Sequence, residues 1–268
     1  MPTELLWALL ALSVIMTVAW LRQRATDNAG IVDVLWAASI GVLAGLFCLF
    51  GDGWGPRRMV VGAMVGFWSV RLTAHLWKRV IGEAEDGRYR YLREIWSDNL
   101  QLKLFAFFQA QAVLAVLLSW PFLVLAGVQR SEWTWLDGLA ILLWGGALFG
   151  ETIADRQLAA WRNDSGNQGR TCREGLWAFS RHPNYFFEWL IWTSYPLMAV
   201  GRTDAALTGW LLWLAPLALL FLILKVTGIP PTEAQAVRKR GDDYRRYQET
   251  VNAFFPGPRD EPETAETT

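Results

Sequence analysis

Apolar residues run along this chain in long stretches, each close to the length that crosses a lipid bilayer as a helix. A run of ~20 apolar residues with few charges is typical of a transmembrane helix, because a helix satisfies its own backbone hydrogen bonds in lipid. The pattern therefore predicts an all-α, polytopic membrane protein with seven transmembrane helices. The predicted spans are 4–21, 31–50, 59–78, 103–127, 134–153, 184–200 and 205–227.

Composition supports this class. Of the 268 residues, 53% are hydrophobic and 17 are Trp, and the formal net charge is zero. The two cysteines, Cys48 and Cys172, fall in an apolar span and in a basic loop, so no disulfide framework is expected. The first span has no basic segment before it and no clear cleavage site. We therefore interpret it as a retained helix and not as a signal peptide.

The basic residues are distributed unevenly between the two ends of the predicted spans. Lys and Arg gather after the first, third, fifth and last spans, whereas the intervening segments hold only Arg57, Arg58, Arg130 and Arg202. The positive-inside rule then places the first group in the cytoplasm, with the N-terminus outside and the C-terminus inside. We expect an integral, multi-pass protein, in the inner membrane if its source is bacterial, with its functional chemistry at the cytoplasmic end.

The chain is predicted to form one seven-helix membrane domain over residues 1–256. Cytoplasmic loops of this domain are expected to build a cofactor site. The final residues, Asp260 to Thr268, are acidic and polar, which predicts a disordered tail over residues 257–268.

The stretch 175–192 places polar groups at the start of the apolar sixth span. Pro183 suits the first turn of a helix and marks the helix start. A carboxylate in an apolar span is costly unless it faces a partner or a wet cavity. We hypothesise that this cytoplasmic helix start holds the polar end of a cofactor. Its polar residues are Ser180, Arg181, His182, Asn184, Tyr185 and Glu188.

Two interpretations of Arg181 and His182 stay open. In the first, Arg181 snorkels to the interface and His182 caps the helix. In the second, a phosphate lies between Arg181 and the helix N-terminus, because an anion there satisfies both. We favour the second, since polar residues continue inward from this point.

Glu151, Asp155 and Arg162 follow one helical stripe at the end of the fifth span. The helix is expected to continue into the cytoplasm. One interpretation is an interfacial helix with solvated charges and a salt bridge. The other is a ligand site, in which Asp155 binds a ribose or amide and Arg162 binds a phosphate.

Other polar residues lie within the spans or between them. Asp33 and Arg71 need partners or water, and pairing with each other is one solution. Gln109 and Gln111 either line a polar pocket or bond neighbouring helices. The charged segment 83–94 reads as a cytoplasmic loop, which is either solvated or folds Arg88 and Tyr89 over the cofactor site. The tail segment 228–247 is expected to start with a Pro turn and to form a short helix; its basic residues contact anionic lipid or add to a phosphate site.

Several signatures are missing from the sequence. There is no Gly-x-Gly-x-x-Gly after a strand, no Gly-x-Ser-x-Gly, and no Cys/His cluster with metal-ligand spacing. The chain has only two His residues, which excludes a His-rich metal centre. We therefore predict no Rossmann site and no metal.

Two motifs resemble a known family. Gly-Leu-Trp-x-x-Ser-Arg-His-Pro-Asn-Tyr-x-x-Glu and a later Gly-Asp-Asp-Tyr-x-x-Tyr are similar to the steroid 5α-reductase superfamily. The chain looks closest to a bacterial branch formerly catalogued as an uncharacterised membrane family. The resemblance covers most of the chain from Asp33 to Pro256. The Arg-His-Pro-Asn-Tyr core also resembles sterol C14 reductases and isoprenylcysteine carboxyl methyltransferases.

This resemblance implies a seven-span fold that binds NADPH from the cytoplasmic side. The family's Asn-x-x-x-Asp-x(6)-Arg pattern matches Asp155 and Arg162, with Glu151 in place of the Asn. Its polar residues on the sixth helix match Asn184 and Glu188. The full set of cofactor residues predicted here is Arg71, Arg88, Asp155, Arg162, Arg181, His182, Asn184, Tyr185 and Glu188.

The family also uses a Glu on the second helix and a Tyr on the third helix to hydrogen-bond the substrate carbonyl. Asp33 is the possible counterpart of that Glu. Trp68 is nearest to the Tyr position but cannot protonate in the same way, and Tyr89 is a replacement for it. The resemblance therefore predicts Asp33 and Tyr89 as catalytic residues.

The function implied is NADPH-dependent reduction of the conjugated C=C bond of a lipophilic enone similar to a 3-oxo-Δ4 steroid. The alternative is a membrane methyltransferase that uses S-adenosylmethionine on a lipid or prenylated thiol. Relatives of that kind carry paired glutamates in the tail, where this chain has Glu233. The expected partners are membrane lipid and a lipophilic substrate that enters from the bilayer, with no nucleic acid and no obligate protein partner.

Overall fold

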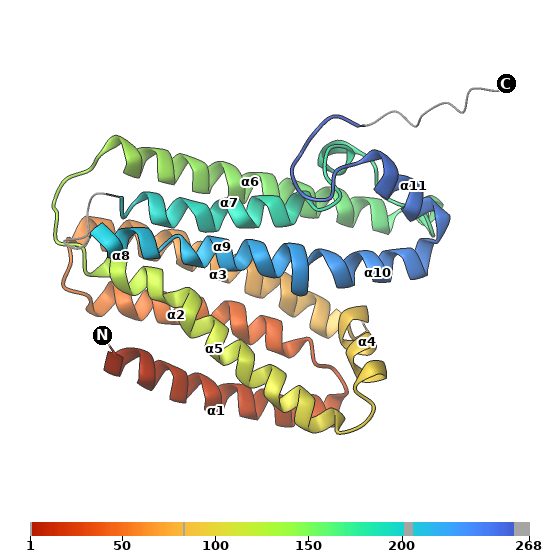
Figure 1. Cartoon of the computed structure of the whole chain (residues 1–268), viewed down its shortest axis with the longest axis horizontal. Helices are drawn as coiled ribbons and strands as arrows, with labels where there is room; N and C mark the ends of the chain where they lie inside the picture. The colour runs from red at the N-terminus through yellow and green to blue at the C-terminus, as the bar shows by residue number, and fades with distance from the viewer. Residues whose placement is uncertain (1, 83, 201–205, 260–268) are drawn as a thin grey trace. The chain divides into compact units, whose positions relative to one another are not determined.

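The structure is a computed structural model, and it describes residues 2–82, 84–200 and 206–259. These residues form helices and turns, with no strand among them. The long helices are drawn in Figure 1. The α-helices are α1 (Pro2–Thr26), α2 (Ile31–Phe50), α3 (Gly55–Gly82), α4 (Gly87–Ile95), α5 (Leu100–Ala126), α6 (Trp135–Asn163), α7 (Pro183–Leu197), α8 (Ala206–Leu211), α9 (Leu214–Phe221), α10 (Ile229–Arg240) and α11 (Asp242–Thr250). Short helical turns are η1 (Ser165–Asn167), η2 (Gly175–Ala178) and the π-turn η3 (Leu222–Val226).

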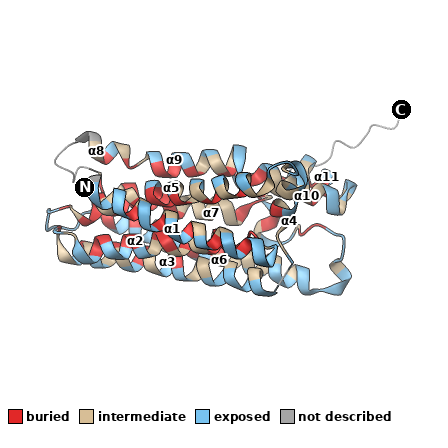
Figure 2. Cartoon of the chain, turned by 90° about the horizontal axis from the view of Figure 1, so that it is seen from below, coloured by how far each residue is buried: buried red, intermediate tan, exposed pale blue. Residues whose placement is uncertain are grey.

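Six helical segments are long and apolar enough to cross a membrane. Their surfaces suit lipid: Trp7, Val14 and Val18 share one face of α1 and are each more than half exposed. Figure 2 shows the exposed and buried positions interleaved along the helices. The chain is therefore an all-helical, integral multi-pass membrane protein. The six segments are Thr3–Thr26, Ile31–Phe50, Gly55–Gly82, Leu100–Ala126, Trp135–Asn163 and Thr208–Arg240.

The sixth predicted span is the exception. It corresponds to α7, which begins at Pro183 as predicted but has only 15 residues. A helix of that length rises about 22 Å, less than the ~30 Å of a bilayer core. The count of seven crossings therefore stays a prediction. Arg202, one of the four basic residues between the basic segments, lies outside the described residues. So does residue 205, the first residue of the last predicted span.

The described residues group into two compact units. The first comprises Met1–Thr134 and Met198–Ala215, and the second comprises Trp135–Leu197 and Pro216–Thr268. We describe each unit by itself.

In the first unit, α2 packs against α3 and α5, and α1 packs against α5. Gly41 allows the close approach of α2 and α3, because a Cβ there would lie 2.1 Å from the Ser69 hydroxyl oxygen. Gln109 of α5 accepts a hydrogen bond from Ser13 of α1 at 2.7 Å and donates one to Thr17 at 3.1 Å. For Gln109 the helix-bonding interpretation is therefore confirmed.

In the second unit, α6 packs along α7. Gly150 permits this contact, since a Cβ there would meet the Phe187 ring at 2.5 Å. The predicted extension of the fifth span is confirmed, because α6 continues to Asn163. The tail forms two helices, α10 and α11, which pack through a buried cluster of Ala236, Tyr244, Tyr247 and Val251.

The last described residues are attached to the second unit. The backbone N–H of Gly257 donates to the Phe179 carbonyl at 3.0 Å, and the Arg259 side chain donates to the Ala178 carbonyl at 3.2 Å. The predicted tail 257–268 thus begins with two residues, Gly257 and Arg259, that are bound to the second unit. Residues 260–268 lie outside the described residues.

Candidate functional site

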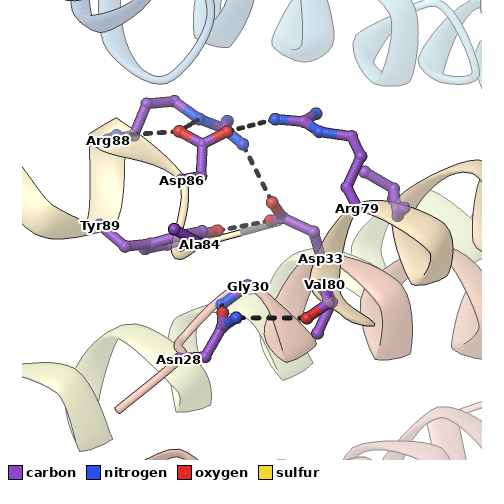
Figure 3. A pocket seen from close by; sticks show the side chains of 10 residues that line it. Asn28, Gly30, Asp33, Arg79, Val80, Ala84, Asp86, Arg88 and Tyr89 are labelled. Atoms are coloured by element: carbon purple, nitrogen blue, oxygen red, sulfur yellow. Dashed lines mark hydrogen bonds and ion pairs between the residues drawn. The ribbon is translucent and has the colours of Figure 1, made fainter. Parts of the chain in front are cut away.

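A polar pocket lies in the first unit where α2, the end of α3 and α4 meet (Figure 3). It combines charged side chains with two apolar residues of α3, Leu76 and Val80, and with the small residues Gly30 and Ala84 of the adjoining segments. Its lining residues are Asn28, Gly30, Asp33, Leu76, Arg79, Val80, Ala84, Asp86, Arg88 and Tyr89.

The two predicted catalytic residues meet in this pocket. The Tyr89 hydroxyl donates a hydrogen bond to Asp33 Oδ1 at 2.7 Å, and Arg88 Nη2 donates to Asp33 Oδ2 at 3.1 Å. The Asp33 carboxylate is thereby held at both oxygens. Tyr89 is 3% exposed. Burial raises the pKa of Tyr89 well above its ordinary value and the Asp33 charge raises it further, so the phenol keeps its proton at neutral pH.

Asp86 links two arginines above this pair. Its carboxylate accepts from the Arg88 backbone N–H at 2.9 Å and from Arg88 Nε at 3.2 Å, and it also pairs with Arg79. Burial alone would raise the pKa of Asp86, but Arg88, the backbone N–H and Arg79 outweigh it and hold the pKa below its usual range. The order Arg79–Asp86–Arg88–Asp33 alternates in sign, so the four charges balance.

Most of the segment predicted as a loop is helical, because residues 87–94 belong to α4. Asp86 caps the N-terminus of α4 through the Arg88 N–H, which starts a helix at Gly87. Glu85 accepts from Arg93 Nε at 2.9 Å and from the Ala29 N–H at 2.8 Å. These bonds fix α4 to the start of α2, so that Tyr89 faces the unit interior.

Arg88, which was predicted to bind a phosphate, pairs with two carboxylates of the protein instead. Two of its side-chain nitrogens donate to the carboxylates of Asp86 and Asp33. A phosphate at Arg88 would compete with both. Arg71 lies on α3 of the same unit and is partly buried.

The second unit brings together two predicted cofactor residues. Asn184 Nδ2 of α7 donates to Asp155 Oδ1 of α6 at 3.3 Å. Asn184 Oδ1 accepts from the Tyr185 N–H at 3.0 Å, which fixes the amide at the helix start. Glu188, one turn further along α7, accepts from Trp192 Nε1 at 2.9 Å. A carboxylate and an amide therefore lie side by side at the α6–α7 contact.

Arg162 lies seven residues after Asp155 on α6, near the end of the helix, and its side chain is exposed. Two helical turns bring a residue back to the same face. Asp155, Asn184 and Arg162 thus offer an acceptor, an amide and a cation on the α6 side of this unit. Glu151 is buried on the same helix.

Arg181 and His182 are engaged by the tail. Glu233 of α10 accepts from Arg181 Nε at 2.6 Å and lies 3.2 Å from His182 Nε2. Glu233 also accepts from Gln248 Nε2 at 2.7 Å and from the Tyr244 hydroxyl at 3.3 Å. Arg181 Nη1 adds a bond to the Gln248 carbonyl at 3.0 Å. We call these five side chains the Glu233 cluster.

The Glu233 cluster is largely shielded from solvent: the side chains of Arg181 and Glu233 are 11% and 13% exposed. His182 also stacks on Tyr185, with parallel rings 5.3 Å apart. Burial lowers the pKa of His182, although the Glu233 carboxylate acts in the opposite direction. His182 is therefore neutral at neutral pH. The Tyr185 hydroxyl lies 3.3 Å from the Thr232 hydroxyl of α10.

Two important groups escaped the sequence argument. Asp86 carried a usable signal, because an Asp followed by Gly and a charged, aromatic run is typical of a helix N-cap. The sequence suggests for Glu233 only the place of a methyltransferase tail glutamate. Its role depends on Arg181, which is 52 residues earlier, and no local spacing indicates that contact.

No group of three or more His, Cys, Asp and Glu side chains suited to a metal occurs among the residues that the structure describes. Cys48 and Cys172 are both free, as expected, and both are buried.

Comparison with known proteins points to one family. The chain is similar to an uncharacterized protein from Schizosaccharomyces pombe, with 28% identity over 89% of this chain and 76% of the relative. No solved structure matches it. The family described as "Protein of unknown function (DUF1295)" matches residues 19–251. This match covers most of the chain and includes both candidate sites. We conclude that the chain belongs to the DUF1295 family.

Proposed function

We propose that this protein is an NADPH-dependent reductase that acts on the conjugated C=C bond of a lipophilic enone. The observation that carries the proposal is the hydrogen bond between Tyr89 and Asp33 at 2.7 Å in a polar pocket. An acid and a hydroxyl in contact are what carbonyl activation needs. The resemblance to the steroid 5α-reductase superfamily supplies the reaction class, with a 3-oxo-Δ4 steroid or a similar terpenoid as the substrate type.

The donor set of the second unit fits the polar end of a dinucleotide. Asp155 can accept from ribose hydroxyls, Asn184 can bind an amide or hydroxyl, and Arg162 can pair with a phosphate. When bound, NADPH would supply a hydride to the β-carbon of the enone and leave as NADP⁺, while the substrate gains one proton. We assign Asp155, Arg162, Asn184 and Glu188 to cofactor binding, and we keep Arg71 as a predicted ligand.

The protein's own chemistry lies in the first unit. Tyr89 holds its proton because its pKa is raised, and Asp33 orients the hydroxyl. As substrate binds, the O–H of Tyr89 turns from Asp33 to the carbonyl oxygen and stabilises the charge that develops there. Arg88 meanwhile keeps the Asp33 carboxylate in place. This assignment moves Arg88 from phosphate binding to positioning.

Arg181 and His182 receive a positioning role as well, because the Glu233 cluster occupies their side chains. The same cluster argues against the methyltransferase alternative. Glu233, the single candidate for a tail glutamate of that family, already accepts four hydrogen bonds from protein groups. It has little capacity left for a ligand.

The proposal includes α7 as a seventh crossing, which places the C-terminus and the cofactor site in the cytoplasm. A terminal fluorescent or alkaline-phosphatase fusion tests this topology. A C-terminus outside the cytoplasm would contradict it.

One experiment separates the functions considered. A ligand that binds only the folded state raises the apparent stability, by about 2.7 kcal/mol at a hundredfold excess over its Kd. We expect NADPH to raise the unfolding temperature of the detergent-solubilised protein, and NADH and S-adenosylmethionine to have smaller effects. Stabilisation by S-adenosylmethionine alone would favour the methyltransferase. No response to any of the three would leave a lipid-binding scaffold as the better description.

A further inference from the structure

The three basic residues at the end of α10 differ in their surroundings. Arg238 and Lys239 are exposed, whereas Arg240 is partly buried. The Arg240 guanidinium stacks on the Tyr244 ring of α11, with its central carbon 5.0 Å from the ring centroid. Stacking uses the face of a guanidinium, and its N–H donors point outward in the plane. Arg240 is therefore held where it can bind an acceptor edge-on.

The loop after α6 brings Thr171 to the same place. Its backbone N–H donates to Asp243 Oδ2 of α11 at 2.7 Å, which fixes the loop against the tail (Figure 1). Asp243 and Cys172, the residue after Thr171, both lie within electrostatic range of Arg240. Thr171 is therefore placed between two groups that are each close to Arg240.

Two donors at this place are buried and have no acceptor. Arg240 Nε and Thr171 Oγ1 make no hydrogen bond to any described residue, and Thr171 is only 4% exposed. Leaving a buried donor unpaired is costly, so such groups usually have a partner. Because the two donors come from segments that converge here, they indicate an acceptor that a ligand supplies.

Arg162 approaches the same place from the end of α6. Burial raises the pKa of the Cys172 thiol, while the charges of Arg162 and Arg240 act in the opposite direction. Charges influence one another over about 10 Å in 0.1 M salt, so both guanidinium groups lie around this thiol. Because its pKa is raised, the thiol is neutral at neutral pH and does not balance the two cations.

The described carboxylates near these cations are engaged elsewhere or open to solvent. Asp243 accepts from Arg173 Nη2 at 3.0 Å and from the Thr171 N–H, and Glu174 is exposed. A phosphate monoester carries about 1.5 to 2 negative charges and three acceptor oxygens. Two guanidinium groups and one hydroxyl match that group in charge and in donors.

We propose that Arg240, Thr171 and Arg162 bind one phosphate monoester. The inference rests on the proposed function for the source of this group: it is the 2′-phosphate that distinguishes NADPH from NADH. Arg240 then makes the protein selective for NADPH, whereas Asp155 and Asn184 bind groups that both dinucleotides share.

A matched pair of nucleotides tests the site without turnover. Adenosine 2′,5′-bisphosphate and adenosine 5′-monophosphate differ by the 2′-phosphate alone. Their affinities for the detergent-solubilised full chain follow from the dependence of the unfolding temperature on nucleotide concentration. We expect wild-type protein to bind the bisphosphate at least about tenfold more tightly. Arg240→Gln should reduce this preference about tenfold and Thr171→Val by a smaller factor, and neither should change the affinity for the monophosphate.

Two further variants separate a specific site from general attraction. Arg240→Lys keeps the charge but loses the planar fork, so it should retain part of the preference. Lys239→Gln removes the exposed charge beside Arg240 and should change neither affinity. The site is refuted if wild type binds both nucleotides equally or binds neither, or if Arg240→Gln acts as Lys239→Gln does. If Arg240→Gln does not fold, Arg240→Lys and Thr171→Val give the same comparison.

A lipid arm and a turnover arm locate the source of the phosphate. If phosphatidic acid in mixed micelles stabilises the protein through Arg240 and the 2′-phosphate gives no preference, the phosphate belongs to a lipid headgroup and the dinucleotide assignment is overturned. An Arg240-dependent preference in a protein that consumes no NADPH with an enone would refute the reductase and leave the phosphate site standing. Equal enone-dependent oxidation of NADH and NADPH would leave the reductase and refute the role of Arg240.

Discussion

The two units use charged side chains in opposite ways. In the first unit, Arg79, Asp86 and Arg88 are close in sequence and surround a pocket that reaches Asp33. In the second unit, Glu233 joins the segment before α7 to two tail helices, and its partners are buried with it. The first arrangement leaves a polar surface open to a ligand, whereas the second uses its hydrogen-bonding capacity to hold the chain together.

The same difference separates the polar residues at the start of α7 into two groups, according to the part of the second unit that each contacts. In the sequence they form one polar stretch, and all of them except Ser180 are predicted cofactor ligands. Arg181 and His182 point to the Glu233 cluster, while Asn184 bonds to Asp155 of α6. Neighbouring residues at one helix start thus divide between fastening the tail and forming a ligand site.

The largest expected effect is that of Glu233→Ala, which tests whether the Glu233 cluster holds the tail in place. It leaves a buried arginine without its carboxylate, and loss of one partner of a buried pair typically costs about 3–5 kcal/mol. We expect denaturant unfolding in detergent to show a loss of that order, and proteases to cut the tail after the basic residues of α10. Loss of stability should exceed that of any pocket variant in the first unit.

Glu249→Ala is the matched control, because this acidic residue of α11 is exposed. It should change stability by less than about 0.5 kcal/mol. Equal, small effects of both substitutions would mean that the Glu233 cluster does not fasten the tail.

How far the sequence could anticipate this division depends on the range of each contact. Apolar runs and Pro183 predicted the long helices and the start of α7, since those signals are local. Tyr89 was placed in a loop because the charges around it suggested solvent, whereas its bond to Asp33 spans 56 positions. Likewise Arg181 resembles a phosphate ligand until Glu233, 52 positions later, folds onto it.

A second substitution, Tyr89→Phe, sharpens the claim that the first unit is the catalytic one. It removes the hydroxyl that bonds Asp33 and leaves Arg88 on the carboxylate. General acid catalysis contributes about 10²–10⁴-fold, so we expect enone-dependent NADPH oxidation to fall at least about 100-fold. Stability should change by only about 1 kcal/mol.

Tyr91→Phe provides the comparison, because Tyr91 is 37% exposed on the same short helix. Its turnover should stay within about twofold of wild type. Full activity in Tyr89→Phe would remove Tyr89 from the reaction and leave the pocket as a structural feature.

Arg162→Ala tests the predicted cofactor site of the second unit. If Arg162 pairs with a phosphate, its loss should weaken NADPH binding about tenfold, equivalent to about 1.4 kcal/mol. Titration of the unfolding temperature with NADPH measures this. Arg156→Ala, on an exposed position of the same helix, should bind NADPH as wild type does. Unchanged affinity in Arg162→Ala would remove that residue from the site.

The smallest expected effect is the contribution of His182 to the pH dependence of stability. It tests whether the His182 ring helps to hold the tail in place. Burial lowers the His182 pKa below its ordinary 6.5, while Arg181 and Glu233 face the same ring. His182 in the unfolded chain therefore becomes protonated near pH 6.5, whereas in the folded protein it becomes protonated only at lower pH. The free energy of unfolding decreases as the pH falls between these two pKa values. The slope is at most about 1.4 kcal/mol per pH unit for one group.

We expect the unfolding temperature to decrease between about pH 7.5 and pH 5.5, and His182→Gln, which cannot be protonated there, to show a flatter profile. Asp86 of the first unit should contribute nothing to this change, because Arg88 and Arg79 hold its pKa below the usual range and it stays ionised throughout that window. Its contribution is lost only in more acidic solution, as the pH falls through its folded pKa. A profile that His182→Gln leaves unchanged would mean that another group sets the pH response, and that the ring does not share in fastening the tail.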